Sequence, residues 1–456
     1  MHTLEIFLLL SIFISISFLM LLDNRENAIY FLFFAILVAM AQFFDSGFRW
    51  QLLPAIYLLP LVFLVYKYGH SKKSTPFYKA VVFVWFVIAT IVPWALPVFK
   101  LPMPYGPFNV GTERFHIVDS TRFEWFTKKD LNDRRELMLQ AWYPSNVRPI
   151  TKPENYMDFM ELRSPALASA GGIPAFTTSH LERVKTNSYL DLKCIESENG
   201  LPVVIFSHGI TGSRFLHQNL YEHLSSNGYV VFALDHSYDS NLTIFPDGRF
   251  ANYRSEITGH PDSVAIRNKQ MTTRMLDLIF VINWLSRLNL GHITSELSQN
   301  LNLDNISVGG HSFGGATAIF AAFQDKRIKS CFVLDSWISP LPDFVIDSGL
   351  KVPFLFVGRP NWNDSGYPTN YLKLDGLLKN STENKYRLFI KNTLHLDYTD
   401  IPLMSPIVNL FMDVGTLRPK ESLPLINNLV LNFLDENSLK KKNELSILLQ
   451  SELISQ

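Results

Sequence analysis

The sequence predicts an α/β fold, a mostly parallel sheet with helices on both faces, preceded by a helical membrane region. Strand-like and helix-like patterns alternate from about residue 201 onward, as expected for parallel strands joined by crossover helices. Four long apolar runs occupy residues 1–100, and only eleven of the 82 charged side chains fall there. The front of the chain is therefore apolar, whereas the rest has an ordinary globular composition.

The apolar runs are Ile6 to Leu22, Ala28 to Phe44, Leu52 to Tyr66 and Ala80 to Phe99. A helix that crosses the hydrocarbon core of a bilayer needs about 20 apolar residues, and roughly 17 is the lower bound. The third run is short and contains Pro54 and Pro60. A buried helical domain is the alternative, but charges confined to the gaps between runs favour membrane spans. We expect residues 1–100 to form about four transmembrane helices of an integral, multi-pass protein.

Lysines predict the orientation of these spans. Lys67, Lys72, Lys73 and Lys79 cluster between the third and fourth runs, whereas each of the other gaps holds a single arginine. Short loops rich in lysine and arginine stay in the cytoplasm. The fourth span then exits outward, and residues 101–456 are expected to be extracytoplasmic.

The charge balance argues against a nucleic-acid-binding protein, and the cysteine content indicates no disulfide-rich fold. Lysine plus arginine equals aspartate plus glutamate, at 41 each, so no global positive field attracts nucleic acid, and we expect no nucleic-acid partner. Cys194 and Cys331 are the two cysteines. Two cysteines do not establish a disulfide framework, so their pairing stays open.

The elements of residues 101–456 follow in order along the chain. "ERFHIV" and "ELMLQAWYP" predict two antiparallel strands, and residues 146–200, which lack a clear period, predict a loop-rich, lid-like insertion. Helices are expected at 215–229, 265–288, 316–324 and 424–434. The tail "SLKKKNELSILLQSELISQ" predicts an exposed or amphipathic helix at best. Buried strands are predicted at "LPVVIFSHG", "VVFALDHS", "LDNISVGG", "IKSCFVLDS", "VPFLFVG" and "YRLFIKNT".

Ser312 is the candidate nucleophile. It stands in "GHSFGG", between a predicted strand and a predicted helix. A nucleophile elbow needs this placement, because its tight turn demands small flanking residues and lifts the hydroxyl to the carboxyl edge of the sheet. A serine that only caps a helix is the alternative. Its context between glycines at a strand-to-helix junction favours the nucleophile.

A serine hydroxyl needs a base that a third group orients. Serine, acid and histidine follow one another in this order along the chain in folds of this class. His395 is the one histidine after Ser312, so we expect it to be the base. Asp335 and Asp364 both follow predicted strands and are both candidate acids, and periodicity does not choose between them.

Two backbone N–H groups are expected to form an oxyanion hole. Phe313, the residue after the nucleophile, offers one, and Ile210 in "FSHGIT" offers the other. A metal site at His208, His236 and His311 is disfavoured, since the sequence holds no H-E-x-x-H or comparable spacing. Neither phosphate-binding glycine motif is present, and we expect neither a metal nor another cofactor.

From about Tyr105 to Asp435 the chain resembles the platelet-activating factor acetylhydrolase family, the plasma and intracellular serine phospholipases and their bacterial relatives. The matching pieces are "VGTERFHIVDS", "LMLQAWYP", "VVIFSHGI", "RNKQMTTRMLDLIFVINWL", "GHSFGGATA", "VLDSW" and "HLDYTD". The resemblance implies an α/β-hydrolase fold and calcium-independent hydrolysis of short or oxidised sn-2 acyl groups of phospholipids. It implies Ser312 as nucleophile, His395 as base and Asp335, rather than Asp364, as acid.

Three functions are consistent with these features. The first is a membrane-anchored serine esterase of the phospholipase type, whose partners are an ester substrate and the bilayer. The second is a general carboxylesterase or lipase for soluble or polymeric esters. The third, from another class, is a catalytically silent hydrolase fold that serves as a membrane receptor or binding module. An intact serine, acid, histidine and oxyanion set favours an enzyme.

Overall fold

The computed structural model describes residues 2–47, 49–68, 75–127, 130, 132–190, 192–255, 263–363, 367–441 and 444–455. The chain divides into two compact units, one built on Met1–Phe99 and one that starts at Lys100. Each unit has a hydrophobic core of its own. We describe the two units separately.

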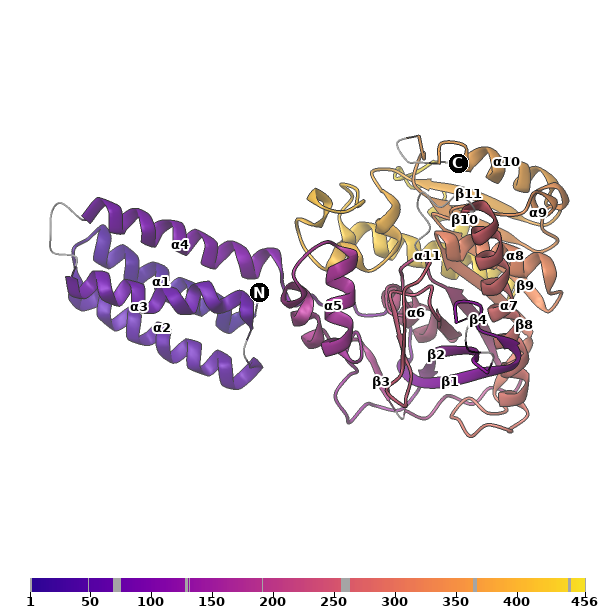
Figure 1. Cartoon of the computed structure of the whole chain (residues 1–456), viewed down its shortest axis with the longest axis horizontal. Helices are drawn as coiled ribbons and strands as arrows, with labels where there is room; N and C mark the ends of the chain where they lie inside the picture. The colour runs from indigo at the N-terminus through magenta and orange to yellow at the C-terminus, as the bar shows by residue number, and fades with distance from the viewer. Residues whose placement is uncertain are drawn as a thin grey trace. The chain divides into compact units, whose positions relative to one another are not determined.

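The first unit consists of long apolar helices (Figure 1). They are α1 (Thr3–Met20), α2 (Arg25–Ser46), α3 (Leu53–Tyr68), which follows a 3-10 turn at Trp50–Leu52, and α4 (Thr75–Ala95). Within the described residues, four helical segments are long and apolar enough to cross a membrane. Pro60 and Pro93 lie inside α3 and α4, a placement that membrane helices tolerate.

Apolar side chains also cover the outside of this unit. Ile12, Ala35 and Leu58 are fully buried between the helices, whereas Phe33 and Phe83 are more than half exposed. A helix that is apolar on all sides is buried in a large core or surrounded by lipid. The exposed phenylalanines therefore favour a lipid environment for α2 and α4.

The second unit is built on a ten-stranded sheet with the order β12-β11-β10-β9-β8-β4-β5-β2-β1-β3. The neighbours from β5 through β4 and β8 to β11 are parallel, while β1, β2 and β12 pair antiparallel with β2, β5 and β11. The strands are β1 (Asn109–Phe123), β2 (Arg134–Ser145), β3 (Ser188–Leu190), β4 (Leu201–Ser207), β5 (Val230–His236), β8 (Leu301–His311), β9 (Ile328–Leu334), β10 (Phe354–Gly358), β11 (Lys385–Ile390) and β12 (Ile454–Ser455). The predicted mostly parallel sheet and the antiparallel pair β1–β2 are confirmed.

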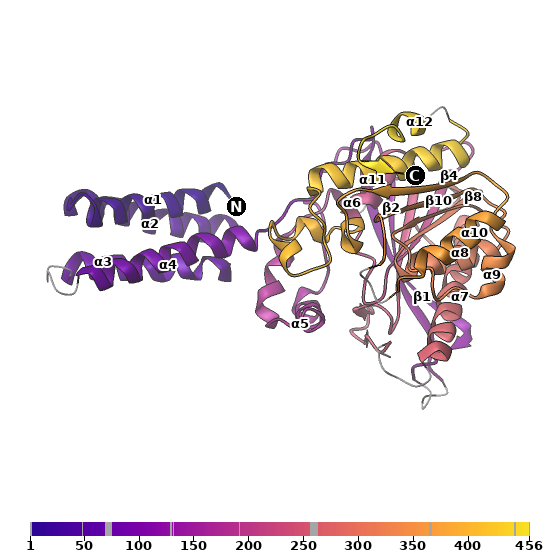
Figure 2. The same ribbon diagram turned by 90° about the horizontal axis from the view of Figure 1, so that it is seen from above.

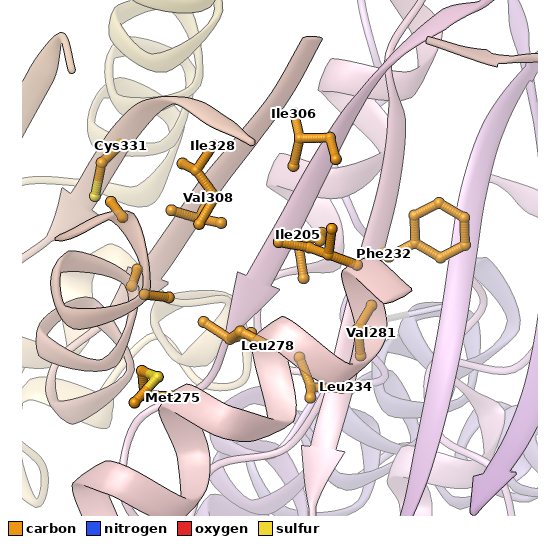
Figure 3. Packing of buried hydrophobic residues seen from close by; sticks show 14 of the residues in the cluster. Ile205, Phe232, Leu234, Met275, Leu278, Val281, Ile306, Val308, Ile328 and Cys331 are labelled. Carbon is orange, nitrogen blue, oxygen red and sulfur yellow. The ribbon is translucent and has the colours of Figure 1, made fainter. Parts of the chain in front are cut away.

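Helices cover both faces of this sheet, as Figure 2 shows. One face packs against α6 (Gln218–Ser226) and α11 (Pro419–Asn437), and the other against α7 (Ser263–Asn289), α8 (Phe313–Gln324) and α10 (Asn370–Asn380). Figure 3 shows Leu278 and Val281 of α7 packed near Ile205 and Leu234 of the sheet. Every residue of β4 and β5 is buried. As expected for parallel strands covered on both faces, the two strands are continuous apolar runs up to the polar residues Ser207, Asp235 and His236 at their carboxyl ends.

Two segments differ from the sequence prediction. The region 146–200 holds a helix, α5 (Met160–Ala170), a 3-10 segment (Ala175–Arg183) and β3, which pairs parallel with β1. It is therefore less loop-rich than predicted. The tail holds a short helix, α12 (Leu445–Leu448), but ends in β12, which pairs with the end of β11. The prediction of an exposed or amphipathic helix for the tail is wrong at this strand, where Ile454 is buried.

Candidate active site

Ser312 lies in the turn between β8 and α8. Its backbone has φ 57° and ψ −125°, a strained conformation for a residue with a side chain. A Cβ on Gly310 would come within 2.2 Å of the Gly314 carbonyl oxygen, and one on Gly314 within 2.1 Å of the Ser207 carbonyl oxygen. Since only glycine fits at these two positions, the glycines of "GHSFGG" make the elbow possible.

His395 connects Ser312 to Asp335. Its Nε2 lies 2.9 Å from Ser312 Oγ, and its Nδ1 lies 2.6 Å from Asp335 Oδ2. A carboxylate only accepts hydrogen bonds, so Nδ1 carries the proton and Nε2 is left to accept from the serine hydroxyl. The structure thus brings together Ser312 and His395, which the sequence pattern selected, and Asp335, which the family resemblance favoured over Asp364. They come from the ends of β8 and β9 and from the loop after β11.

The carboxylate of Asp335 is fully buried and held by further donors. Oδ1 accepts from the Arg359 backbone N–H at 3.0 Å and from Trp362 Nε1 at 3.3 Å, and Arg359 Nε lies 3.4 Å from Oδ2. The Trp362 ring also packs edge-on against the His395 ring. These contacts fix the orientation of both the carboxylate and the imidazole.

Sequence reasoning did not find Arg359 and Trp362. Both lie in "GRPNW", directly after β10, the strand next to β9. Residues that follow neighbouring parallel strands meet at the same edge of a sheet, so their position after the strand was the available signal. Asp364, the alternative acid in the same loop, lies outside the described residues.

The two predicted oxyanion donors are the backbone N–H groups of Ile210 and Phe313. Among the described residues, neither Ile210 N–H nor Phe313 N–H has a hydrogen-bond acceptor. Phe313 is the first residue of α8, where backbone N–H groups are unsatisfied and the helix dipole is positive. The Ile210 loop packs against the nucleophile, since a Cβ on Gly209 would lie 3.1 Å from Ser312 Cβ.

Other histidines near the site are buried and neutral. His311 Nε2 donates to the His395 carbonyl oxygen at 3.0 Å, and burial, with the neighbouring His395 adding to it, lowers the pKa of His311 well below its usual range. Burial lowers the pKa of His217 to about 3. In the part of the chain that the structure describes, no three histidine, cysteine or acidic side chains gather as metal ligands.

The insertion 146–200 is tied to the loops around the site. Tyr156 Oη donates to Asp400 Oδ2 at 3.0 Å, five residues beyond His395. Asp158 accepts from the fully buried guanidinium of Arg214 at 2.7 Å, in the segment that follows the Ile210 loop. The start of the insertion is therefore anchored to both loops. The insertion also exposes large apolar side chains, which are Val147, Ile150, Phe159, Leu162, Ile173 and Phe176.

Comparison with known proteins shows the family to which this fold belongs. Residues 99–451 match the family model "Platelet-activating factor acetylhydrolase, isoform II", which covers most of the chain. The chain belongs to this acetylhydrolase family. It is 25% identical over 250 residues to the platelet-activating factor acetylhydrolase of Gallus gallus and 27% identical over 218 residues to that of Canis lupus familiaris.

The matches to these relatives span only part of each protein. The matches span 49% and 44% of this chain and 58% and 48% of the two relatives, so the chain spans about half the length of the curated relatives it matches. A ferulic acid esterase of Streptomyces cinnamoneus has a similar fold, with a TM-score of 0.63 and 24% identity, over 79% of this chain and 99% of that one. The second unit is thus an α/β-hydrolase fold.

The helical unit lies almost entirely before the matched family region, which begins at residue 99. Cys194 and Cys331 of this acetylhydrolase-family chain are both free and buried. Burial raises the pKa of Cys194 to about 12, which makes it an unreactive thiol.

Proposed function

We propose that this chain is a membrane-anchored serine hydrolase of carboxylic esters, with Ser312 as nucleophile, His395 as general base and Asp335 as the acid that orients it. One observation carries the proposal. A continuous chain of hydrogen bonds runs from Asp335 through His395 to Ser312 Oγ, with distances of 2.6 and 2.9 Å. It ends at a strained elbow, near the Ile210 and Phe313 N–H groups, which have no acceptor among the described residues.

In the first half of the reaction, His395 Nε2 takes the proton of Ser312 Oγ as that oxygen attacks the ester carbonyl carbon. The Ile210 and Phe313 N–H groups stabilise the negative charge that develops on the carbonyl oxygen. His395 then gives its proton to the leaving alkoxide. An alcohol departs, and the acyl group stays on Ser312.

In the second half, His395 Nε2 takes a proton from water, whose oxygen attacks the acyl carbon. The same N–H groups stabilise the second tetrahedral intermediate. Its collapse returns the proton to Ser312 and releases the carboxylic acid. Asp335 keeps its charge throughout and stabilises the imidazolium that forms in each half.

We further propose that the substrates are phospholipids with short or oxidised sn-2 acyl groups. Family membership supports this class. Aromatic residues near the nucleophile also support an apolar acyl group: the Trp337 backbone N–H donates to the Ser312 carbonyl oxygen at 3.1 Å, and the Trp337 and Tyr367 rings lie 4.4 Å apart. A membrane anchor raises the effective concentration of the enzyme at a bilayer substrate. The insertion 146–200 would serve as a lid-like cover.

Labelling with a fluorophosphonate tests the nucleophile. The detergent-solubilised full chain should be labelled, and Ser312→Ala should abolish labelling, because no other side chain is expected to form the covalent adduct. Ser169→Ala is the matched control, since Ser169 is an exposed serine of α5 and its loss should leave labelling unchanged. Persistent labelling of Ser312→Ala would rule out this nucleophile.

A substrate panel separates the proposal from its alternatives. Phospholipids with sn-2 acetyl or oxidised acyl groups should be cleaved faster than those with long unmodified chains. Cleavage of p-nitrophenyl esters without cleavage of any phospholipid would favour a general carboxylesterase. Absence of both activities, together with absence of labelling, would favour a silent binding module.

A further inference from the structure

A second serine–histidine–aspartate chain lies buried beside the candidate site. Ser207 Oγ lies 2.9 Å from His236 Nε2, and His236 Nδ1 lies 2.8 Å from Asp277 Oδ2. All three residues are fully buried, so no substrate reaches Ser207. Ser207 is the last residue of β4 and directly precedes His208, Gly209 and Ile210. The hydrogen-bonded set Ser207–His236–Asp277 therefore lies under the loop that carries a proposed oxyanion donor.

Two arginines hold this buried serine–histidine–aspartate set in place. Arg135 donates from Nε and Nη2 to the two carboxylate oxygens of Asp277, at 3.1 and 2.6 Å. Arg274 donates from Nη2 to Ser207 Oγ at 3.2 Å and also to the His208 carbonyl oxygen. A buried charge that is paired and hydrogen-bonded is costly to displace. The base of the Ile210 loop is thus rigidly supported.

His208 connects the buried serine–histidine–aspartate set to the Ile210 loop. Its Nε2 accepts from the His236 backbone N–H at 3.2 Å, and its Nδ1 lies 2.6 Å from the Gly209 carbonyl oxygen. Because Nε2 accepts, the single proton of the neutral ring lies on Nδ1, and Nδ1–H donates to Gly209. Burial, helped by the positive charge of Arg274, keeps the ring neutral by lowering the pKa of His208 well below its usual range.

The Gly209 carbonyl and the Ile210 N–H belong to the same planar peptide unit. A hydrogen bond to the carbonyl oxygen fixes the plane of that unit and hence the direction of the N–H. It also polarises the unit, which strengthens the N–H as a donor. Gly212 N–H donates to the same oxygen at 3.2 Å.

We infer that His208 is a positioning residue for the oxyanion hole, whose Nδ1–H, through the Gly209 carbonyl, aims and strengthens the Ile210 N–H. The inference rests on the proposed function, because the Ile210 N–H matters only if Ser312 is acylated. His208 itself contacts neither the substrate nor the reacting atoms in this mechanism. Its effect should therefore appear in the stabilisation of the tetrahedral intermediate and not in substrate binding.

Three variants separate the two hydrogen bonds of His208. The amide nitrogen of asparagine occupies the position of Nδ1, so His208→Asn keeps a donor to Gly209 and loses the contact with His236. The amide of glutamine reaches the position of Nε2, so His208→Gln keeps that contact and loses the donor to Gly209. His208→Leu loses both. Measurements of kcat, KM and Tm on the full chain accompany each variant.

We expect His208→Gln and His208→Leu to lower kcat about tenfold or more, below the roughly 10²–10³-fold cost of deleting an oxyanion donor outright. KM should change less than about threefold, and His208→Asn should retain most of kcat. The Ki of a trifluoromethyl ketone, whose serine adduct carries the oxyanion, should rise by the same factor as kcat falls. A purely structural role would not produce this parallel change.

Several outcomes would overturn the inference. Wild-type kcat in all three variants would show that the Nδ1–H bond does not assist the reaction. Equal losses in His208→Asn and His208→Gln that follow a common fall in Tm would show a role in folding alone. Active wild-type protein is present in both cases, so the proposed function would survive. An inert wild-type chain that fluorophosphonate does not label would overturn both.

Discussion

Asp335 does more than accept a single hydrogen bond from the imidazole. With no exposure to water, it accepts from the His395 ring, the Arg359 backbone and the Trp362 indole. The resulting orientation keeps the ring proton of His395 on Nδ1, so that Nε2 accepts from the Ser312 hydroxyl. Removal of the carboxylate charge therefore changes both the tautomer and the stability of the imidazolium.

Asp335→Asn should lower turnover by about 10⁴, the cost of the same change in other triads. The asparagine amide can donate to Nδ1, which moves the ring proton to Nε2 and blocks acceptance from Ser312. Rates of ester hydrolysis by the purified full chain measure the effect. Asp364→Asn, in the other candidate acid, should change the rate less than tenfold, and the reverse pattern would assign the acid to Asp364 while leaving Ser312 and His395 in place.

The His395 loop is itself stabilised by a buried carboxylate. Asp397 lies in the 3-10 segment His395–Tyr398, and its Oδ2 accepts from the backbone N–H groups of Leu394 and Gly415 at 2.7 and 2.6 Å. Among the described residues, Oδ1 has no partner. Burial raises the pKa of Asp397 to about 6, although the two N–H groups act in the opposite direction.

The folded chain thus holds the Asp397 proton more tightly than the unfolded chain, whose pKa is near 4. The stability that this proton contributes is fully present below pH ~4 and is lost as the pH rises through about 6. At complete titration this loss is roughly 3 kcal/mol. Asp397→Asn keeps an oxygen for the two N–H groups and does not titrate.

The Tm of Asp397→Asn minus the Tm of wild type should therefore be a few degrees larger at pH 8 than at pH 5. Thermal unfolding of the solubilised full chain at both pH values measures this. Asp343, whose side chain is 82% exposed, provides the control, because Asp343→Asn should follow the pH dependence of wild type. A pH-independent difference for Asp397→Asn would contradict the argument.

Local sequence signals predict the elements at the site better than those that cover it. The glycines around Ser312 and the strand-to-helix change predict the elbow because these requirements are local. The helix α5 contains Pro165 and several serines and alanines, so its apolar period is weak. The strand β12 forms because Ile454 pairs with Ile390, and no local pattern predicts a partner 64 residues away. The support under Ile210 likewise joins β4, β5 and α7.

The chain combines a unit that family membership explains with one that it does not. The family match begins at residue 99, after the fourth apolar helix ends at Ala95. The role of the helical unit therefore depends on physical arguments alone, from length, composition and exposed phenylalanines. We propose that it anchors the enzyme, and its orientation decides which leaflet supplies the substrate.

The four lysines at and between the adjoining ends of α3 and α4 predict that this connection is cytoplasmic and that the hydrolase unit is outside. Lys67 lies in the last turn of α3 and Lys79 near the start of α4, while Lys72 and Lys73 lie outside the described residues. Because both native cysteines are buried, new cysteines can be probed with a membrane-impermeant maleimide at low background. Ser169→Cys in α5 should be labelled in intact cells.

The matched control is Tyr68→Cys at the end of α3, where the tyrosine is 63% exposed. This cysteine should be labelled only after the cells are permeabilised, since it lies beside the lysine cluster. If Tyr68→Cys were labelled in intact cells and Ser169→Cys only after permeabilisation, the orientation would be the reverse of the predicted one. The hydrolase unit would then face the cytoplasm, and its phospholipid substrate would come from the inner leaflet, where oxidised or short acyl chains would have to be generated inside the cell.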